Sequence, residues 1–192
     1  MTQSLELRKL TMSSALVAIA FAIELLIKFV LPMLNMPFGG NFIGLSMLPM
    51  VIVGFLYGFK YGIIAGFVYG VFEVILAPSG YIIGWSFLLD YLVGFTAYGL
   101  TGLFVGKLKS VKFVVLGVLL AGFVRYLSVS IAGVIFWSET ANFDAFLYSF
   151  IYYNLGYNVS TTIITLVLLI LIRKRIVMLN EDFLGKNLGS LS

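Results

Sequence analysis

Five ionisable side chains fall inside long apolar stretches, where a charge is costly and therefore marks a functional candidate. They are Glu24, Lys28, Glu73, Asp90 and Arg125. The four-residue spacing of Glu24 and Lys28 predicts an intrahelical ion pair near one end of a helix. Arg125 needs a carboxylate or carbonyl partner, which we expect to be a structural ion pair. The sequence leaves the role of Glu73 open.

Asp90 is the most informative of the five because aromatic residues surround it. Tyr81 and Trp85 precede it and Tyr91 follows it. Two later stretches place further rings and two asparagines near the same end of the predicted helices: Phe136, Trp137, Phe143, Phe146, Tyr148, Tyr152, Tyr153, Asn154, Tyr157 and Asn158. A carboxylate below a set of rings can hold a flat organic cation through charge pairing, cation–π contact and stacking. An asparagine can read a ring edge with one donor and one acceptor group.

An interfacial belt of aromatic residues is the alternative explanation for these rings. A belt is expected at both membrane surfaces, and it accounts for part of the set. The opposite ends of the same stretches, however, offer mainly Tyr57, Phe59, Tyr61, Phe104 and Phe113, and no Trp. This asymmetry favours a pocket on one side.

The composition excludes a soluble protein and most enzyme chemistry. Of 192 residues, 61% are hydrophobic and 10% charged, whereas a soluble domain has about 25% charged residues. The chain has no Cys and no His, which excludes disulfides and thiolate nucleophiles and removes the commonest general base and metal ligand. It also has no Gly-x-x-x-x-Gly-Lys-[Ser/Thr] motif for ATP. We therefore expect an integral membrane protein that is not an enzyme and holds no cofactor.

The element pattern predicts one all-α transmembrane domain over residues 1–192. The apolar stretches are continuous rather than alternating, which favours helices over a β-barrel. Six of them are long enough to span a membrane: 11–31, 42–57, 61–77, 81–105, 112–137 and 145–172.

The positions of the basic residues predict the topology. Ten of the twelve Lys and Arg side chains flank one end of the six stretches. They are Arg8, Lys9, Lys60, Lys107, Lys109, Lys112, Arg173, Lys174, Arg175 and Lys186. Because positive loops stay inside, both termini are predicted to be cytoplasmic. The basic pI then reflects topology, with lipid headgroup binding as a by-product, and does not indicate nucleic acid.

Two series of small residues recur every four positions. One runs through the second and third stretches: Gly54, Gly58, Gly62, Gly66 and Gly70. It predicts close internal packing of helix backbones. The other is the stripe Ser14, Ala18 and Ala22 in the first stretch. This small-residue stripe fits either an internal seam or a face that docks onto another membrane subunit.

A series of short motifs follows in order from Arg8 to about Leu168. It comprises Met36-Pro37-Phe38-Gly39-Gly40-Asn41, Met47-Leu48-Pro49, Gly58-x-Lys60-x-Gly62-x-x-Ala65-Gly66, Leu88-Leu89-Asp90-Tyr91-Leu92-Val93-x-Phe95, Gly99-x-x-Gly102, Arg125-Tyr126, Ala132-Gly133-Val134-Ile135-Phe136-Trp137 and Tyr148-Ser149. In these motifs the chain resembles the thiamin-specific ThiT family, the substrate-binding S components of energy-coupling factor (ECF) vitamin transporters.

The resemblance implies a six-helix S component in a prokaryotic cell membrane. Such a subunit would bind thiamin, or a closely related vitamin or precursor, from outside. It would work with an EcfT-type membrane scaffold and two ABC-type ATPase subunits, with Ser14, Ala18 and Ala22 as its docking face. By matching position, Asp90 would pair with the thiazolium cation. The full set of expected binding residues is Tyr81, Trp85, Asp90, Tyr91, Trp137, Tyr148, Asn154 and Asn158.

Three departures from the family pattern bear on the ligand. Val129 stands where family members usually carry His, and the segment Ile83-Gly84-Trp85-Ser86-Phe87 stands where relatives tend to carry a polar His-Pro-x-Gln run. The segment 148–154 is one residue longer, so either a bulge keeps Asn154 in place or Asn158 substitutes for it. Pyridoxine or hydroxymethylpyrimidine therefore stay open as ligands. The alternative function is a self-sufficient secondary carrier or channel for a small organic cation, with Glu73, Asp90 or Arg125 as a relay.

Overall fold

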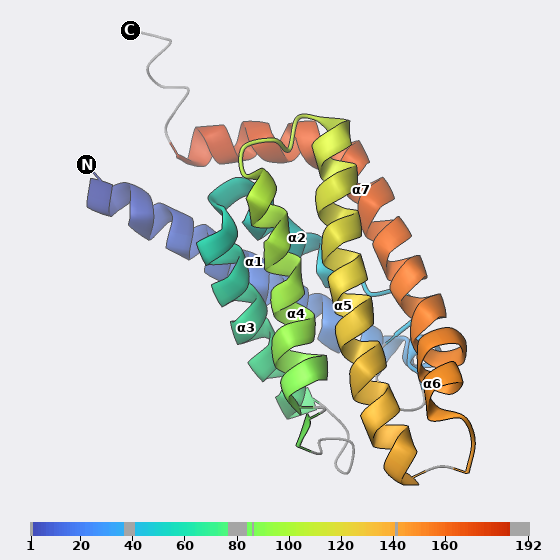
Figure 1. Ribbon diagram of the computed structural model, residues 1–192. Helices are drawn as coiled ribbons and strands as arrows, with labels where there is room; N and C mark the ends of the chain where they lie inside the picture. Colours follow the sequence, from blue (N-terminus) through green and yellow to red (C-terminus); the bar gives the residue numbers. More distant parts are fainter. Residues whose placement is uncertain (1, 37–40, 77–83, 86, 141, 185–192) are drawn as a thin grey trace, which may run out of the picture.

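The computed structural model describes residues 2–36, 41–76, 84–85, 87–140 and 142–184, and within these ranges the regular structure is helical (Figure 1). A single isolated bridge between Asn35 and Asn41 is the one β-type contact in the described chain. The predicted binding residue Tyr81 and the basic residue Lys186 lie outside the described residues.

Six helical rods cover the described ranges. Their elements are α1 (Thr2–Val30), α2 (Met47–Tyr57), α3 (Phe59–Leu76), then η2 (Phe87–Val93), α4 (Gly94–Thr96) and η3 (Ala97–Phe104) in one rod, α5 (Val111–Thr140), and finally α6 (Ala145–Leu147), η4 (Tyr148–Asn154) and α7 (Leu155–Phe183) in the last rod. A short turn, η1 (Pro32–Leu34), follows α1. The predicted all-helical class is therefore confirmed. The last rod extends eleven residues beyond the predicted boundary at 172.

Three described helical segments are long and apolar enough to cross a membrane: Ser4–Val30, Phe87–Phe104 and Val111–Ser138. The shorter helix Met47–Tyr57 is also apolar. Large apolar side chains are exposed along these helices, including Phe29, Leu119 and Phe123. Exposed apolar side chains of this kind are expected where a helix faces lipid.

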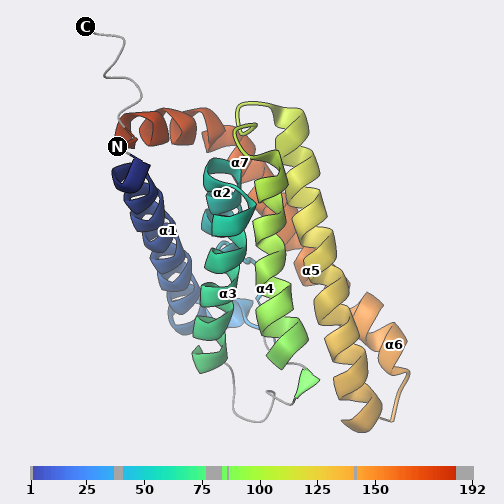
Figure 2. The same ribbon diagram turned by 60° about the vertical axis from the view of Figure 1, so that its left-hand side comes forward.

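The rod Phe87–Phe104 lies between α3 and α5 and is called the central rod below (Figure 2). It packs against α2, α3 and α5, while α7 packs against α5 and α2. Helix α1 is peripheral and contacts α2 and α3 (Figure 2). The helices that pack against this rod therefore come from distant parts of the sequence.

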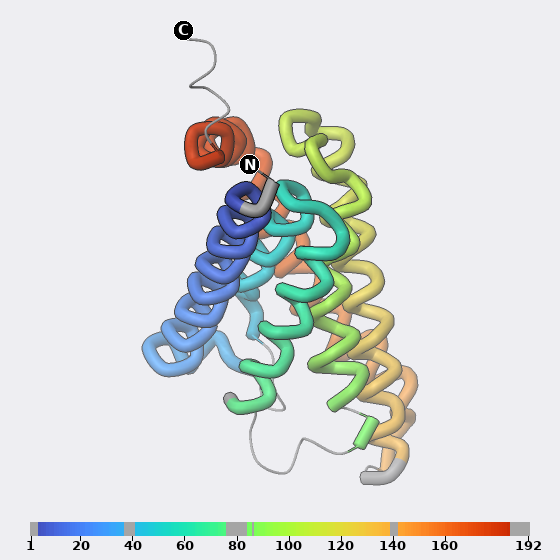
Figure 3. Tube along the Cα trace, turned by 90° about the vertical axis from the view of Figure 1, so that its left-hand side faces the viewer, coloured from blue at the N-terminus to red at the C-terminus, as the bar shows by residue number. Residues whose placement is uncertain are grey.

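The first turns of α1 and the last turns of α7 lie at the same end of the bundle (Figure 3). Arg8 Nη1 donates to the Phe183 carbonyl at 3.1 Å, and Tyr57 OH donates to Asn180 Oδ1 at 2.6 Å. The loop after η3 joins this end through the ion pair of Lys109 with Glu181, at 3.1 Å. Basic segments that are far apart in the sequence thus meet on one side of the molecule.

The glycine series of α2 and α3 packs against the central rod, as the sequence predicts. A Cβ built at Gly62 would lie 2.7 Å from Gly99 Cα, and one at Gly66 would lie 2.5 Å from the Phe95 carbonyl oxygen. Gly58 ends α2 with a φ of 91°, which allows the tight turn into α3. These backbones approach too closely for any side chain to fit between them.

Gly99→Ala is expected to lower the free energy of unfolding by about 1–3 kcal/mol, because its Cβ would lie 2.5 Å from the Gly62 carbonyl carbon and neither backbone can yield cheaply. Thermal unfolding in detergent measures this loss. Gly156→Ala is the matched control, since nothing lies within 4 Å of a Cβ at that position of α7. Equal melting temperatures for the two variants would contradict the close packing of the Gly62 and Gly99 backbones.

Candidate functional site

One face of α5 carries both the charged and the aromatic parts of the candidate site. Arg125, Val129, Gly133 and Trp137 recur every four residues, so each lies beside the next along a stripe that winds gradually around the helix. At 1.5 Å per residue the stripe is about 18 Å long. The residue types along it change from a cation, through a small apolar side chain and a glycine, to a large ring.

Arg125 stacks on aromatic rings of the central rod. Its guanidinium carbon lies 4.1 Å from the centroid of the Phe95 ring and 5.3 Å from that of Tyr98. Gly94 leaves room for it, because a Cβ there would be 3.2 Å from Arg125 Nη1. The predicted ion pair is wrong: no described carboxylate lies within ion-pair distance of the guanidinium. Cation–π contact with two rings holds the charge instead.

Three carboxylates surround this cation at longer range. Asp90, Glu73 and Glu24 each interact electrostatically with Arg125. They come from η2, α3 and α1 respectively. The interior of the bundle therefore contains one polar cluster built from four different rods.

Glu24 makes contacts beyond the one that the sequence predicts. Its Oε1 accepts a hydrogen bond from Asn41 Nδ2 at 2.6 Å, and its Oε2 accepts one from Ser46 Oγ at 3.0 Å. Lys28, four residues further along α1, also interacts electrostatically with this carboxylate. Through its hydrogen bonds, Glu24 fastens α1 to the chain that enters α2.

Three buried polar atoms in this cluster make no hydrogen bond of good geometry among the described residues, although the side chains of Tyr69 and Glu73 interact with each other. They are Arg125 Nη1, Tyr69 OH and Glu73 Oε1. Tyr69 is fully buried and interacts electrostatically with both Glu73 and Glu24. Because buried polar atoms are normally satisfied, donors and acceptors left over in one place are suited to a bound polar ligand. Tyr69 is not among the predicted site residues, because a tyrosine in an apolar stretch is unremarkable.

The other end of the α5 stripe lies in an aromatic cluster. Trp137 is 6% exposed, and its ring centroid lies 4.8 Å from that of Tyr148 and 5.0 Å from that of Tyr153. Gly133 makes room for the indole, since a Cβ there would lie 2.8 Å from a ring carbon of Trp137. Val129 packs into the same cluster. Tyr153, which was not among the predicted binding residues, is as central to the cluster as Tyr148.

Both segments that flank the stripe are π-helical. One is η2, which contains Asp90, and the other is η4, which begins at Tyr148. A π-helical turn accommodates an extra residue and often occurs at functional sites. The additional residue in the segment 148–154 is absorbed in this way, which is the bulge that the sequence left as one of two alternatives.

Hydrogen bonds between α5 and the two π-helical segments hold them in place. Ser128 Oγ donates to the Leu89 carbonyl at 2.6 Å, and Tyr126 OH donates to the Phe150 carbonyl at 3.0 Å. Ser149 Oγ donates back to the Ser130 carbonyl at 2.7 Å. Helix α5 is therefore the scaffold on which both irregular segments are fixed.

The two candidate asparagines have different surroundings. Asn154 Nδ2 donates to the carbonyl and the hydroxyl of Ser149, both at 3.0 Å, and its Oδ1 accepts from Tyr157 OH at 2.9 Å. Asn158 Nδ2 donates to the Asn154 carbonyl at 2.8 Å. Asn154 is thus engaged at both ends of its amide in stabilising the π-helical segment.

Other predicted residues lie further from the α5 stripe. Trp85 is 62% exposed, and Tyr91 is half-buried with its ring centroid 6.4 Å from that of Phe95. Ser14, Ala18 and Ala22 of α1 are exposed, and Ser14 and Ala18 face the space between α1 and α3. The small-residue stripe therefore forms a surface rather than an internal seam.

Nothing in the described chain groups three or more Asp or Glu residues in a way that could hold a metal ion. The candidate site consists instead of a stacked arginine, carboxylates, tyrosine hydroxyls and a cage of rings. Apolar helices of membrane-spanning length that enclose such a cluster define an integral membrane protein with a candidate small-molecule site inside its helical bundle.

Within that class, the chain belongs to the family described as Thiamine transporter protein (Thia_YuaJ), which it matches over residues 14–180. It is 27% identical over 184 residues to the thiamine transporter ThiT of Bacillus subtilis (strain 168), covering 90% of this chain and 93% of that protein. The solved structure of ThiT from Listeria monocytogenes has the same fold, with a TM-score of 0.73 at 20% identity over 88% of this chain and 95% of that one. The resemblance to ThiT-like S components is confirmed.

Proposed function

We propose that this protein is a vitamin-binding subunit that captures thiamin, or a closely related vitamin or precursor, from outside the cell. The observation that carries the proposal is the α5 stripe, which joins the buried polar atoms around Arg125 to the ring cage around Trp137. Thiamin has a cationic ring and a flat pyrimidine ring. Carboxylates and aromatic rings are the side chains that suit those two parts, through charge pairing and stacking respectively.

The proposed roles follow the positions of the side chains. Asp90 pairs with the cation, while Trp137 and Tyr148 stack on the rings. Asn154 or Asn158 reads a ring edge, with Asn158 favoured because the amide of Asn154 is engaged in the π-helical segment. Tyr81, Trp85 and Tyr91 contribute at the periphery. The side chain of Val129 cannot make a hydrogen bond to a ligand, whereas the His that family members usually carry there can. Related vitamins should therefore be tested beside thiamin.

The proposed topology has six membrane spans and both termini in the cytoplasm of a prokaryotic cell. Its support is the common end formed by α1, α7 and the basic loop before α5. In this orientation the aromatic cluster faces outward and the polar cluster around Arg125 lies deeper.

The proposed partners are an EcfT-type membrane scaffold and two ABC-type ATPase subunits, which would hydrolyse the ATP. The exposure of Ser14, Ala18 and Ala22 supports a docking role, because small residues let another helix approach closely. No nucleic acid or cofactor is part of the proposal.

Intrinsic fluorescence and calorimetry test ligand binding directly. The protein has two tryptophans, so Trp85→Phe leaves Trp137 as the sole reporter. Thiamin is expected to quench Trp137 and to release heat at micromolar concentration in the purified, detergent-solubilised full chain. Pyridoxine and hydroxymethylpyrimidine are tested as competitors, and the relative affinities of the three compounds identify the preferred ligand. No response to any of the three would reject the proposal.

The second candidate is a self-sufficient carrier for a small organic cation, favoured by the two further carboxylates Glu24 and Glu73 beside the site. Liposomes that contain this chain alone, with a proton gradient and no ATPase, distinguish the two. Uptake of labelled thiamin would support the carrier. Binding without uptake would support the S component.

A further inference from the structure

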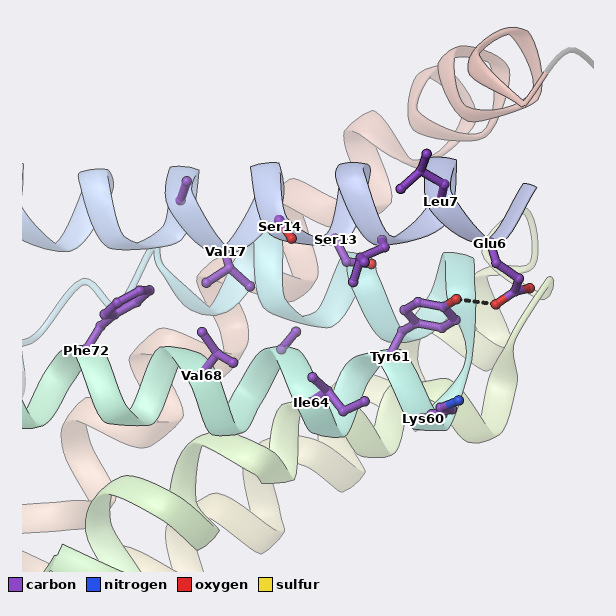
Figure 4. Close-up of a pocket in the computed structure, with 13 residues that line it drawn as sticks. Glu6, Leu7, Ser13, Ser14, Val17, Lys60, Tyr61, Ile64, Val68 and Phe72 are labelled. Carbon is purple, nitrogen blue, oxygen red and sulfur yellow. Dashed lines mark hydrogen bonds between the residues drawn. The ribbon is translucent and has the colours of Figure 1, made fainter. Parts of the chain in front are cut away.

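A groove between α1 and α3 lies on the outer side of the bundle, away from the candidate site. Its volume is about 730 Å³ (Figure 4). Leu10, Val17 and Ala18 line it from α1, and Val68 and Phe72 from α3. The groove is therefore an apolar channel bounded by two helices.

Polar groups gather at one end of the groove. Glu6, Lys60 and Tyr61 line it there, and Tyr61 OH donates a hydrogen bond to Glu6. Lys9 Nζ also bonds Glu6, at 2.8 Å. Lys60 interacts electrostatically with Glu6 as well. Glu6 is thus an anion with two cations nearby, and Lys9 is the one that forms an ion pair with it.

Lys60 is exposed at this end, and no carboxylate among the described residues lies within ion-pair distance of it. It belongs to the end of the bundle where basic loops meet. The groove consequently combines an apolar length with an available cation at its polar end, and this charge is complementary to a phosphate.

The length of the groove matches one leaflet of a bilayer. From Leu7 to Ala18, α1 rises about 16 Å at 1.5 Å per residue. Half of the roughly 30 Å hydrocarbon core is about 15 Å. An acyl chain anchored at the polar end would therefore run the full length of the groove.

We propose that the α1–α3 groove binds one anionic phospholipid, with an acyl chain between Val17 and Val68 and the headgroup phosphate at Lys60. The selectivity for anionic lipid comes from Lys60, because a zwitterionic headgroup gains less from the same cation. The site includes Ser14 and Ala18 of the small-residue stripe, so the lipid occupies this face only while the proposed scaffold subunit is not docked. The inference does not depend on the proposed vitamin-binding function.

Native mass spectrometry of the full chain tests the headgroup contact. The protein is purified in detergent with equal amounts of phosphatidylglycerol and phosphatidylcholine, washed, and scored for retained lipid. One phosphatidylglycerol per chain is expected to remain, and Lys60→Gln is expected to reduce its retention about fivefold, the equivalent of about 1 kcal/mol. Lys112→Gln, an exposed cation of the same end on α5, is the control and should retain lipid like the parent.

Photo-crosslinking tests the acyl-chain contact. Phosphatidylglycerol with a diazirine on its chain should label peptides of α1 and α3. Val68→Trp, which fills the groove, should lower that labelling, whereas Leu119→Trp on the exposed face of α5 should not. Equal retention of the two lipids, an unchanged Lys60→Gln variant, or labelling spread evenly over α5 and α7 would each overturn the proposal. If Val68→Trp does not fold, Lys60→Gln still tests the proposal, because an exposed lysine can be replaced without disturbing the packing of the helices.

Discussion

Replacing Asp90 with asparagine is expected to weaken thiamin binding at least about 30-fold. The change removes the carboxylate that we assign to the cationic ring while it keeps the shape of the side chain. Loss of one partner of a desolvated charge pair costs about 2–5 kcal/mol, and 2 kcal/mol is a factor of about 30. Calorimetric titration of the purified variant measures the dissociation constant.

The control for Asp90→Asn is a neutral ligand. Hydroxymethylpyrimidine lacks the cationic ring, so its affinity should change by a factor of about 3 or less. Glu73→Gln is the matched variant, because Glu73 is a second carboxylate near Arg125 with a buried oxygen. If Asp90→Asn weakens both ligands alike, Asp90 is structural. If only Glu73→Gln weakens thiamin binding more than hydroxymethylpyrimidine binding, then Glu73 rather than Asp90 pairs with the cationic ring.

Arg125→Met is expected to lower the free energy of unfolding of the ligand-free protein by about 3–5 kcal/mol. The guanidinium is the cation that stacks on Phe95 and Tyr98 among Asp90, Glu73 and Glu24. Its removal leaves carboxylates with less compensation in a low-dielectric interior, which is strongly destabilising. Thermal unfolding in detergent should show a decrease of roughly 10 °C in melting temperature.

Two further variants show whether this effect comes from the buried charge. Arg125→Lys keeps the charge but loses the planar stacking, so an intermediate melting temperature is expected. Arg175→Met removes an exposed arginine from α7 and should change stability by no more than about 0.5 kcal/mol. A melting temperature of Arg125→Met equal to that of Arg175→Met would show that the polar cluster does not depend on its cation.

Much of the α5 stripe was visible in the sequence. Arg125 was found as a charge in an apolar stretch, Trp137 as part of a one-sided set of rings, and Val129 as a departure from the family. All three belong to one helix, and helical periodicity places residues four apart on one face. The glycine series of α2 and α3 was predictable for the same reason, since its spacing alone requires close packing.

The contacts of Arg125 and Glu24 were not predictable in this way. The arginine stacks on Phe95 of another rod, and the glutamate accepts hydrogen bonds from Asn41 and Ser46 of the segment that enters α2. Tyr69 was missed altogether because a tyrosine in an apolar stretch carries no sign of its burial. The periodicity of the sequence describes the faces of a single helix, but it does not say which faces of different helices pack against each other.

The sequence by itself determined that this is a helical membrane protein with its basic segments predicted to lie on one side, because lipid requires continuous apolar helices and topology follows positive charge. It also determined the family through ordered motifs. Only the tertiary structure decided that the segment 148–154 takes its extra residue as a π-helical turn, and that Glu24, Tyr69, Glu73 and Asp90 gather around Arg125. Those outcomes depend on packing among six rods, where the hydrogen bonds and space available to each side chain come from residues up to a hundred positions away.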